Sequence, residues 1–159
     1  MADKSPTPPA WRAGGLPYGV GLTLETARKM LEAGEKEAEK QGVPMVIAIA
    51  DAGGNLLAFH RMDDAMLVSI NIAMDKAFTA VFGKMPTLHW SNMLQNGNFT
   101  TLFIHERWIT FPGGFPIIRD GVLLGGIGVS GGTIEDNHVA RAALKAGGFS
   151  LEDVEAQTG

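Results

Sequence analysis

Apolar residues recur every three or four positions in two parts of the first half of the chain, which is the spacing of an amphipathic α-helix. The first part covers residues 24–41, with Thr23 before it as a helix N-cap and Gly42 after it as a stop. The second covers residues 67–82, in which the apolar positions again return at helical spacing. The pattern therefore predicts two long helices separated by about 25 residues of a different character.

Two further helices are predicted from their capping residues. Thr87 caps a short helix that runs to about Gln95. Thr133 begins the last long helix, TIEDNHVARAALKA, in which Asp136 stands three residues after Thr133, as in a capping box. The sequence after this helix, SLEDVEAQTG, is a polar tail for which no element is predicted.

Two pairs of short apolar runs are separated by turn residues and predict β-hairpins. MVIAIA and LLAFHRM are joined by DAGGN, and FPIIR and VLLGGIGV flank the turn Asp120-Gly121. Hairpins rather than β-α-β crossovers indicate an antiparallel sheet with helices packed on it, which is an α+β fold. The segment 98–111 is rich in aromatic residues without a clean period.

Composition predicts one domain preceded by an arm. The first 21 residues are rich in Pro and Gly and predict an extended N-terminal arm, and residues 22–159 predict a single domain. Trp11 and Tyr18 in the arm either pack on their own domain or lie across a neighbouring subunit. Because the start lacks an apolar signal region and no apolar run reaches membrane-spanning length, we expect a soluble, cytoplasmic protein without a membrane partner.

Net charge and cysteine content exclude several functions. The formal charge of −4 argues against a nucleic-acid partner, because phosphate binding needs clustered Lys and Arg. The chain has no cysteine, which excludes disulfides, thiolate metal sites and a cysteine nucleophile.

The stretch GIGVSG at 126–131 matches the G-x-G-x-x-G fingerprint of dinucleotide-binding turns. A dinucleotide site needs a strand before the glycines and a helix and second parallel strand after them. Here the glycines lie inside the second strand of a hairpin, so neither NAD nor FAD is expected. Glycines in a strand instead indicate close approach of another backbone, a helix or a flat ligand. Ser130 also fits the spacing G-x-S-x-G, but a hydrolase-sized sheet and a positioned histidine are missing.

The four histidines, at positions 60, 89, 105 and 138, include no pair at the i, i+4 spacing of a helical zinc motif. His105 lies between Phe103 and Trp108, an aromatic setting that suits the axial ligand of a haem. The alternative is a histidine in an aromatic patch at a subunit interface.

Two basic residues are further candidates. Arg61, followed by Asp63 and Asp64, either ends a strand in salt bridges or recognises an anion at a pocket mouth, with Asp64 orienting it. Lys76 stands alone in the apolar stretch IAMDKAFTAVF. It either reaches solvent at its tip or, partly buried, serves as an acid/base or binds a carboxylate.

Three blocks of the sequence resemble the GlcG/HbpS family, which includes the C-terminal domain of PduO-type proteins. They are AIADAGGNLLAFHRMDDA (48–65), SINIAMDKAFTAVFGKMPT (69–87) and PGGFPIIRDGVLLGGIGVSGGTIEDNHVARAAL (112–144). The resemblance implies a profilin-like antiparallel sheet flanked by helices, assembly into homo-oligomers, and haem binding by some members. It also implies genes that lie among catabolic genes without an assigned reaction. Carried over by motif, it implies pocket positions at Arg61, Asp64, Lys76, Thr79, Pro112, Gly113, Gly114 and Pro116.

We therefore expect an oligomeric small-ligand-binding protein, larger than a dimer, with haem as its leading ligand and His105 as the metal ligand. The alternative is a cofactor-independent enzyme acting on a small carboxylated or aromatic catabolic metabolite, with Lys76 or His105 as its catalytic group. A third hypothesis is a structural or assembly partner. The pocket is expected between the second helix and the Pro112–Pro116 turn, with an aromatic wall from residues 98–111. The expected ligand-binding residues are His60, Arg61, Asp64, Lys76, Thr79, Phe82, His105, Trp108, Pro112, Gly113, Gly114 and Pro116.

Overall fold

The structure, a computed structural model, describes residues 21–97 and 105–155. Its elements follow the order α1 (Leu24–Gln41), β1 (Val46–Asp51), β2 (Leu56–Arg61), α2 (Val68–Gly83), α3 (Thr87–Gln95), β3 (Gly114–Arg119), β4 (Val122–Ser130), α4 (Ile134–Ala146) and α5 (Leu151–Glu155). Residues 1–20 of the predicted arm and the first half of the aromatic segment, which includes Phe99 and Phe103, lie outside the described residues. None of the described helices is long and apolar enough to cross a membrane.

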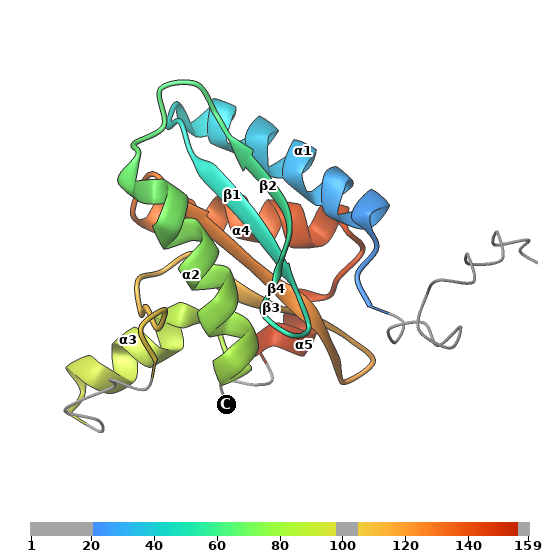
Figure 1. Ribbon diagram of the computed structural model, residues 1–159, viewed down its shortest axis with the longest axis vertical. Helices are drawn as coiled ribbons and strands as arrows, with labels where there is room; N and C mark the ends of the chain where they lie inside the picture. Colours follow the sequence, from blue (N-terminus) through green and yellow to red (C-terminus); the bar gives the residue numbers. More distant parts are fainter. Residues whose placement is uncertain (1–20, 98–104, 156–159) are drawn as a thin grey trace, which may run out of the picture.

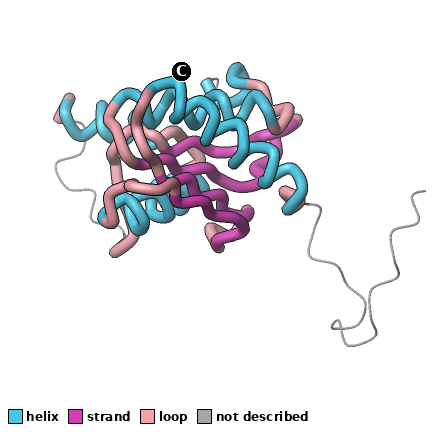
Figure 2. Tube along the Cα trace, turned by 90° about the horizontal axis from the view of Figure 1, so that it is seen from above, coloured by secondary structure: helices cyan, strands magenta, loops and turns pink. Residues whose placement is uncertain are grey.

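The four strands form one sheet in the order β2-β1-β4-β3, and every neighbouring pair is antiparallel. Helices α1 and α4 pack against each other and cover one face, whereas α2 covers the other (Figure 1). Seen from above, the strands form the middle layer between helices on both sides (Figure 2). This arrangement confirms the predicted α+β fold with an antiparallel sheet flanked by helices.

The two central strands present side chains of different size to the two faces. Ile47 and Ile49 of β1, with Ile127 and Val129 of β4, belong to the large core under α1 and α4. The alternate positions carry small residues, so that Ala48 pairs with Gly128 and Ala50 pairs with Gly126 on the face under α2. Because successive side chains of a strand point to opposite faces, the sequence alternation of large and small residues makes two unequal faces.

The glycines of β4 allow the backbone of α2 to lie directly on the sheet. A Cβ atom on Gly128 would collide with the carbonyl oxygen of Ala73, and one on Gly126 would lie 2.5 Å from the carbonyl oxygen of Ala77. Both obstacles are backbone atoms of α2, which cannot rotate away. The close approach expected from the glycine-rich strand is therefore that of a helix.

Capping and turn residues in the sequence predicted most of the helix and strand boundaries. Thr23 caps α1 by accepting the Thr26 N–H at 3.1 Å, and Gly42 ends α1 in a left-handed conformation with φ of 69°. Asp120 and Gly121 form the β3–β4 turn with φ values of 52° and 74°. These positive angles are those that a two-residue hairpin turn requires.

Three local predictions were wrong in detail. Thr87 is the first residue of α3 rather than its cap, and its Oγ1 accepts the Gly114 N–H at 2.9 Å. Asp136 does not close a capping box on Thr133, because its carboxylate is bound to the Gly132 N–H and to Lys76. The polar tail contains helix α5, which packs against β3 and α4 and buries Val154.

Replacement of Gly128 by valine tests the contact between α2 and β4. We expect Gly128→Val to lower the free energy of unfolding by at least about 2 kcal/mol, because overpacking against backbone forces the helix off the sheet. Chemical denaturation followed by circular dichroism measures the change. Gly53→Ala, in the exposed β1–β2 turn beside flexible side chains, is the control and should cost less than about 1 kcal/mol. Equal losses in the two variants would contradict the proposed role of Gly128.

Candidate functional site

A cavity of about 500 Å³ lies between the N-terminal half of α2 and the loop that joins β4 to α4. These two parts of the chain lie side by side in Figure 1. The apolar lining comes from Met66, Val68, Ile72, Phe111, Pro112 and Ile134, and the polar lining includes Ser69, Lys76, Ser130, Thr133 and Asp136. Such a mostly apolar hollow with a few convergent polar groups is typical of a small-molecule site.

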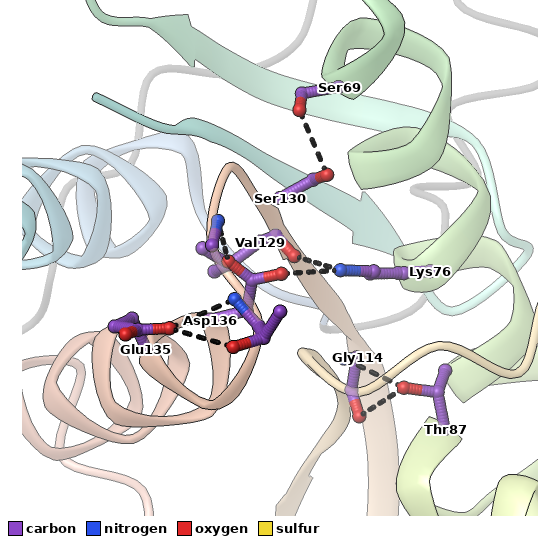
Figure 3. Close-up of polar contacts among 10 residues, drawn as sticks. Ser69, Lys76, Thr87, Gly114, Val129, Ser130, Glu135 and Asp136 are labelled. Atoms are coloured by element: carbon purple, nitrogen blue, oxygen red, sulfur yellow. Dashed lines mark hydrogen bonds and ion pairs between the residues drawn. The ribbon is translucent and has the colours of Figure 1, made fainter. Parts of the chain in front are cut away.

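The strongest polar feature of the cavity is the ion pair between Lys76 and Asp136 (Figure 3). The Lys76 side chain is 2% exposed, and its Nζ donates to Asp136 Oδ2 at 2.8 Å and to the Val129 carbonyl at 2.7 Å. The other carboxylate oxygen, Asp136 Oδ1, accepts the Gly132 N–H at 2.8 Å. The pair therefore links α2, the end of β4 and the start of α4 in one buried network.

Burial disfavours the protonated, charged form of the Lys76 amine. Desolvation lowers the pKa of the Lys76 amine from its ordinary value, and the attraction and hydrogen bond of Asp136 oppose this shift only in part. A lysine with a lowered pKa in a cleft is a recognised sign of a functional amine, and here burial lowers the pKa in spite of the ion pair, which by itself raises it.

A pair of buried hydroxyl groups forms a second polar feature. Ser130 Oγ, at the end of β4, donates to Ser69 Oγ, in the first turn of α2, at 3.0 Å. Both serines line the cavity. Because Ser69 Oγ accepts in this bond, its own proton is available to another acceptor, which gives the cavity a second donor besides the amine.

Gly113 is the backbone position on which this network depends. Its φ is 111°, and a Cβ atom there would lie 2.6 Å from the Val129 carbonyl oxygen and 3.1 Å from Lys76 Nζ. Any side chain at this position would enter the space of the amine and of its carbonyl acceptor. Glycine here keeps the turn before β3 close to the amine, beside the cavity residue Pro112.

The first turn of α4 adds negative charge beside the cavity. Glu135 Oε2 accepts the Thr133 N–H at 2.9 Å and the Thr133 hydroxyl at 3.1 Å. These bonds, together with the N–H of Glu135 itself, lower the pKa of the Glu135 carboxyl from its ordinary value. Glu135 therefore adds negative charge to the first turn of α4, next to Asp136 on the cavity wall.

An aromatic patch made of Phe78, Phe82 and His105 lies at the other end of α2. The Phe78 and Phe82 rings stack with centroids 4.1 Å apart, and the His105 ring lies 4.9 Å from Phe78 and 6.0 Å from Phe82. Phe82 is 53% exposed. His105 Nδ1 accepts the Arg107 N–H at 3.1 Å, which leaves Nε2 as the free ring nitrogen.

Several predicted ligand-binding residues hold the fold together. Thr79 Oγ1 accepts the Ile109 N–H at 3.0 Å and so fastens the segment after His105 to α2. Trp108 packs edge-on against Trp90 of α3, with ring centroids 5.1 Å apart. Gly114 is bound to Thr87, and Pro116 is buried in β3 opposite Gly126.

The remaining predicted residues lie away from the cavity. His60 Nδ1 lies 2.7 Å from the Glu35 carboxylate of α1, and Arg61 lines a separate, charged surface cleft with Glu35 and Asp63. Asp64 is exposed in the loop before α2, with φ of 63°. In the part of the chain that the structure describes, no three His, Asp or Glu side chains gather as a metal site.

The structure thus brings Lys76 and Pro112 into the cavity with Gly113 beside them, and places His105 and Phe82 elsewhere. Sequence reasoning missed Asp136 and Ser69 as cavity residues. The available signal was Lys76 itself, because a charged residue in an apolar helix needs a buried carboxylate partner. Nothing local in the sequence identified which of the chain's acids would be that partner.

Comparison with known proteins identifies a matching family and several similar sequences. Residues 22–145 match a family described as haem degrading protein HbpS-like. The chain is 40% identical to protein GlcG of Escherichia coli K12 over 112 residues, which cover 70% of this chain and 82% of GlcG. It is 37% identical to the corrinoid adenosyltransferase PduO of Salmonella typhimurium over 133 residues, which cover 80% of this chain but 39% of PduO. The chain therefore spans well under half of that relative.

Two solved structures share the fold closely. A PduOC–haem complex has 36% sequence identity and a TM-score of 0.76, with 80% of this chain and 95% of that chain covered. HbpS has 36% identity and a TM-score of 0.76, with 86% of this chain and 96% of that chain covered. Since the family match covers most of the chain and these likenesses extend over nearly all of the fold, the chain belongs to the HbpS-like family.

Proposed function

We propose that this protein binds a small, largely apolar ligand and that haem is its leading ligand. The cavity of about 500 Å³ on the described part of the chain carries the small-ligand role, whereas haem is proposed at the aromatic patch of Phe78, Phe82 and His105. Support for haem comes from the family, because the similar PduOC structure is a haem complex. The exposed aromatic patch beside His105 supports it independently, since a flat ligand gains stacking area there.

The aromatic patch suits a haem better than the cavity does. Among the described residues, the cavity lining contains no His, Cys or Tyr side chain, and the one cation that lines it there, Lys76, is already paired with Asp136. At the patch, the open face of Phe82 would stack on the ring and His105 would ligate through Nε2. Ligation would shift the His105 proton to Nδ1 and break the bond to the Arg107 N–H, which is a modest cost at an exposed position. Bound haem would supply the redox chemistry of its iron.

A second function is favoured by the cavity. The buried amine of Lys76, its carboxylate partner and the Ser69–Ser130 hydroxyl pair converge on one apolar hollow. This arrangement supports a cofactor-independent enzyme that acts on a small catabolic metabolite, with Lys76 as its catalytic group. An aromatic substrate suits the apolar walls better than a carboxylated one, because Asp136 already neutralises the lysine.

Assembly and location complete the proposal. We propose a cytoplasmic homo-oligomer larger than a dimer. Exposed apolar side chains at or beside the mouth of the cavity support the assembly, since such patches mark protein interfaces; they are Met66, Leu67, Val68, Phe111 and Ile134.

A haemin titration followed at the Soret band tests the haem proposal. His105→Ala should abolish a sharp Soret band, because it removes the nitrogen donor of the patch. Phe82→Ala should weaken binding by up to about tenfold through loss of stacking. His138→Ala, at an exposed position of α4, is the control and should leave the band unchanged. Equal effects of the two histidine substitutions, or none from His105→Ala, would argue against the patch as the haem site.

Light scattering of the full chain tests the assembly. We expect a mass more than twice the 16.9 kDa of one chain at micromolar concentration. Leu67→Glu should lower this mass, because Leu67 is 73% exposed and a charge there would be buried in the interface. Asn92→Glu, at an exposed position of α3, should not. A mass of one chain for the unaltered protein would remove the oligomer from the proposal.

A further inference from the structure

Lys76 differs from every other lysine in the described part of the chain. Lys29, Lys36, Lys40, Lys84 and Lys145 are exposed, whereas Lys76 is 2% exposed and lines the cavity. An amine that is removed from water and reachable from an apolar hollow has the surroundings of a nucleophilic lysine. Among the lysines that the structure describes, Lys76 is therefore the one whose reactivity should depart from that of the others.

The hydrogen bonds of Lys76 leave one direction open. An ammonium group has three N–H donors, and two of them are directed to Asp136 Oδ2 and the Val129 carbonyl oxygen. The described residues offer no third acceptor. Asp136 Oδ2, at 2.8 Å, is close enough to take a proton from the amine, and its other oxygen is held in place by the Gly132 N–H.

The charged side chains around the cavity determine which class of ligand the cavity accepts. The positive charge of Lys76 is cancelled by Asp136, and Glu135 adds a further negative charge at the start of α4. A carboxylate entering the cavity would therefore add an uncompensated anion to a desolvated site, which is costly. A neutral ligand with one oxygen acceptor meets the free N–H of Lys76 without this cost.

We infer that the cavity binds a small neutral aldehyde or ketone with an apolar body, and that Lys76 Nζ forms a Schiff base with it. This inference rests on the second proposed function, the cavity enzyme, and not on haem binding. The apolar walls formed by Ile72, Phe111 and Ile134 hold the body of the ligand and exclude water. Exclusion of water favours the imine over its hydrolysis.

The chemistry balances with the groups present. Asp136 takes a proton from the Lys76 ammonium, and the freed nitrogen lone pair forms a C–N bond to the carbonyl carbon. One of the two remaining N–H protons moves to the alkoxide oxygen, which gives a neutral carbinolamine with a hydroxyl group. Asp136 then returns the proton to the oxygen, the C–O bond breaks, and one water leaves. The iminium keeps the positive charge that the ammonium had, so the buried pair with Asp136 persists and the net charge of the site does not change.

Reductive trapping tests this inference on the full chain. The protein is incubated with benzaldehyde and sodium cyanoborohydride at neutral pH, and the modified lysines are located by peptide mapping and mass spectrometry. We expect Lys76 to be modified faster than the exposed lysines, because burial lowers the pKa of its amine and so raises the fraction of the neutral, nucleophilic form. Lys84 and Lys145 serve as internal controls in the same molecule. Modification confined to the exposed lysines would overturn the inference.

Three variants test the roles of the cavity and of Lys76. Ile72→Trp places an indole in the hollow and should abolish labelling of Lys76, whereas Val122→Trp, exposed at the start of β4, should not. The double variant Lys76→Met, Asp136→Leu removes both charges together, so it avoids an unpaired buried charge and should fold. In this double variant, labelling should disappear at position 76 and should persist at the exposed lysines. Unchanged labelling of Lys76 in Ile72→Trp would contradict entry through the cavity.

Binding of benzaldehyde without reductant distinguishes ligand binding in the cavity from covalent reaction with Lys76. If benzaldehyde raises the melting temperature of the unaltered protein but not of Ile72→Trp, and Lys76 is not trapped, the cavity binds ligands and the covalent step is refuted. If benzaldehyde neither raises the melting temperature nor labels Lys76, the cavity function and the inference fail together. The haemin titration decides the haem proposal separately in either case.

Discussion

The contact between α2 and the glycine face of β4 is the constraint on which the rest of the structure depends. Gly126 and Gly128 leave no side chains between the strand and the carbonyl groups of Ala73 and Ala77. A helix that packs on a sheet through larger residues would stand farther away. Because α2 lies so close, side chains on its inner face reach backbone atoms of the strand and groups beyond it, which a more distant helix could not do.

The contacts of the Lys76 side chain depend on the short distance between α2 and β4. It lies one turn after Ala73, and its amine reaches the Val129 carbonyl and Asp136 across the end of β4. Breaking a buried pair by removing one partner commonly costs 3–5 kcal/mol, and a pair of apolar residues is often as stable as the pair itself. The pair is therefore weak evidence for stability alone. Its place on the wall of a cavity is consistent with a retained chemical role.

The two ends of α2 serve different purposes in the functions proposed here. Its N-terminal half forms one wall of the cavity with the start of α4, and its C-terminal end carries the stack of Phe78 and Phe82 beside His105. A flat ligand on the patch needs aromatic rings on which to stack and a ring nitrogen that binds it. A small neutral ligand in the cavity needs a desolvated hollow and an amine. The same helix can therefore support two separate sites.

Every helix and strand except α5 could be predicted from the sequence, because caps, turns and apolar spacing act between residues that are close along the chain. Thr23, Gly42 and the Asp120-Gly121 turn are of this kind, and the α+β fold followed from the hairpins. Only the tertiary structure decided what the glycines of β4 contact, that Asp136 rather than another acid pairs with Lys76 sixty positions away, and that His105 stands apart from the cavity. Such pairings depend on how closely one helix packs on the sheet. The glycines of β4 indicated a close approach, but which helix makes it and which acid it brings to Lys76 result from the packing of residues far apart in the sequence.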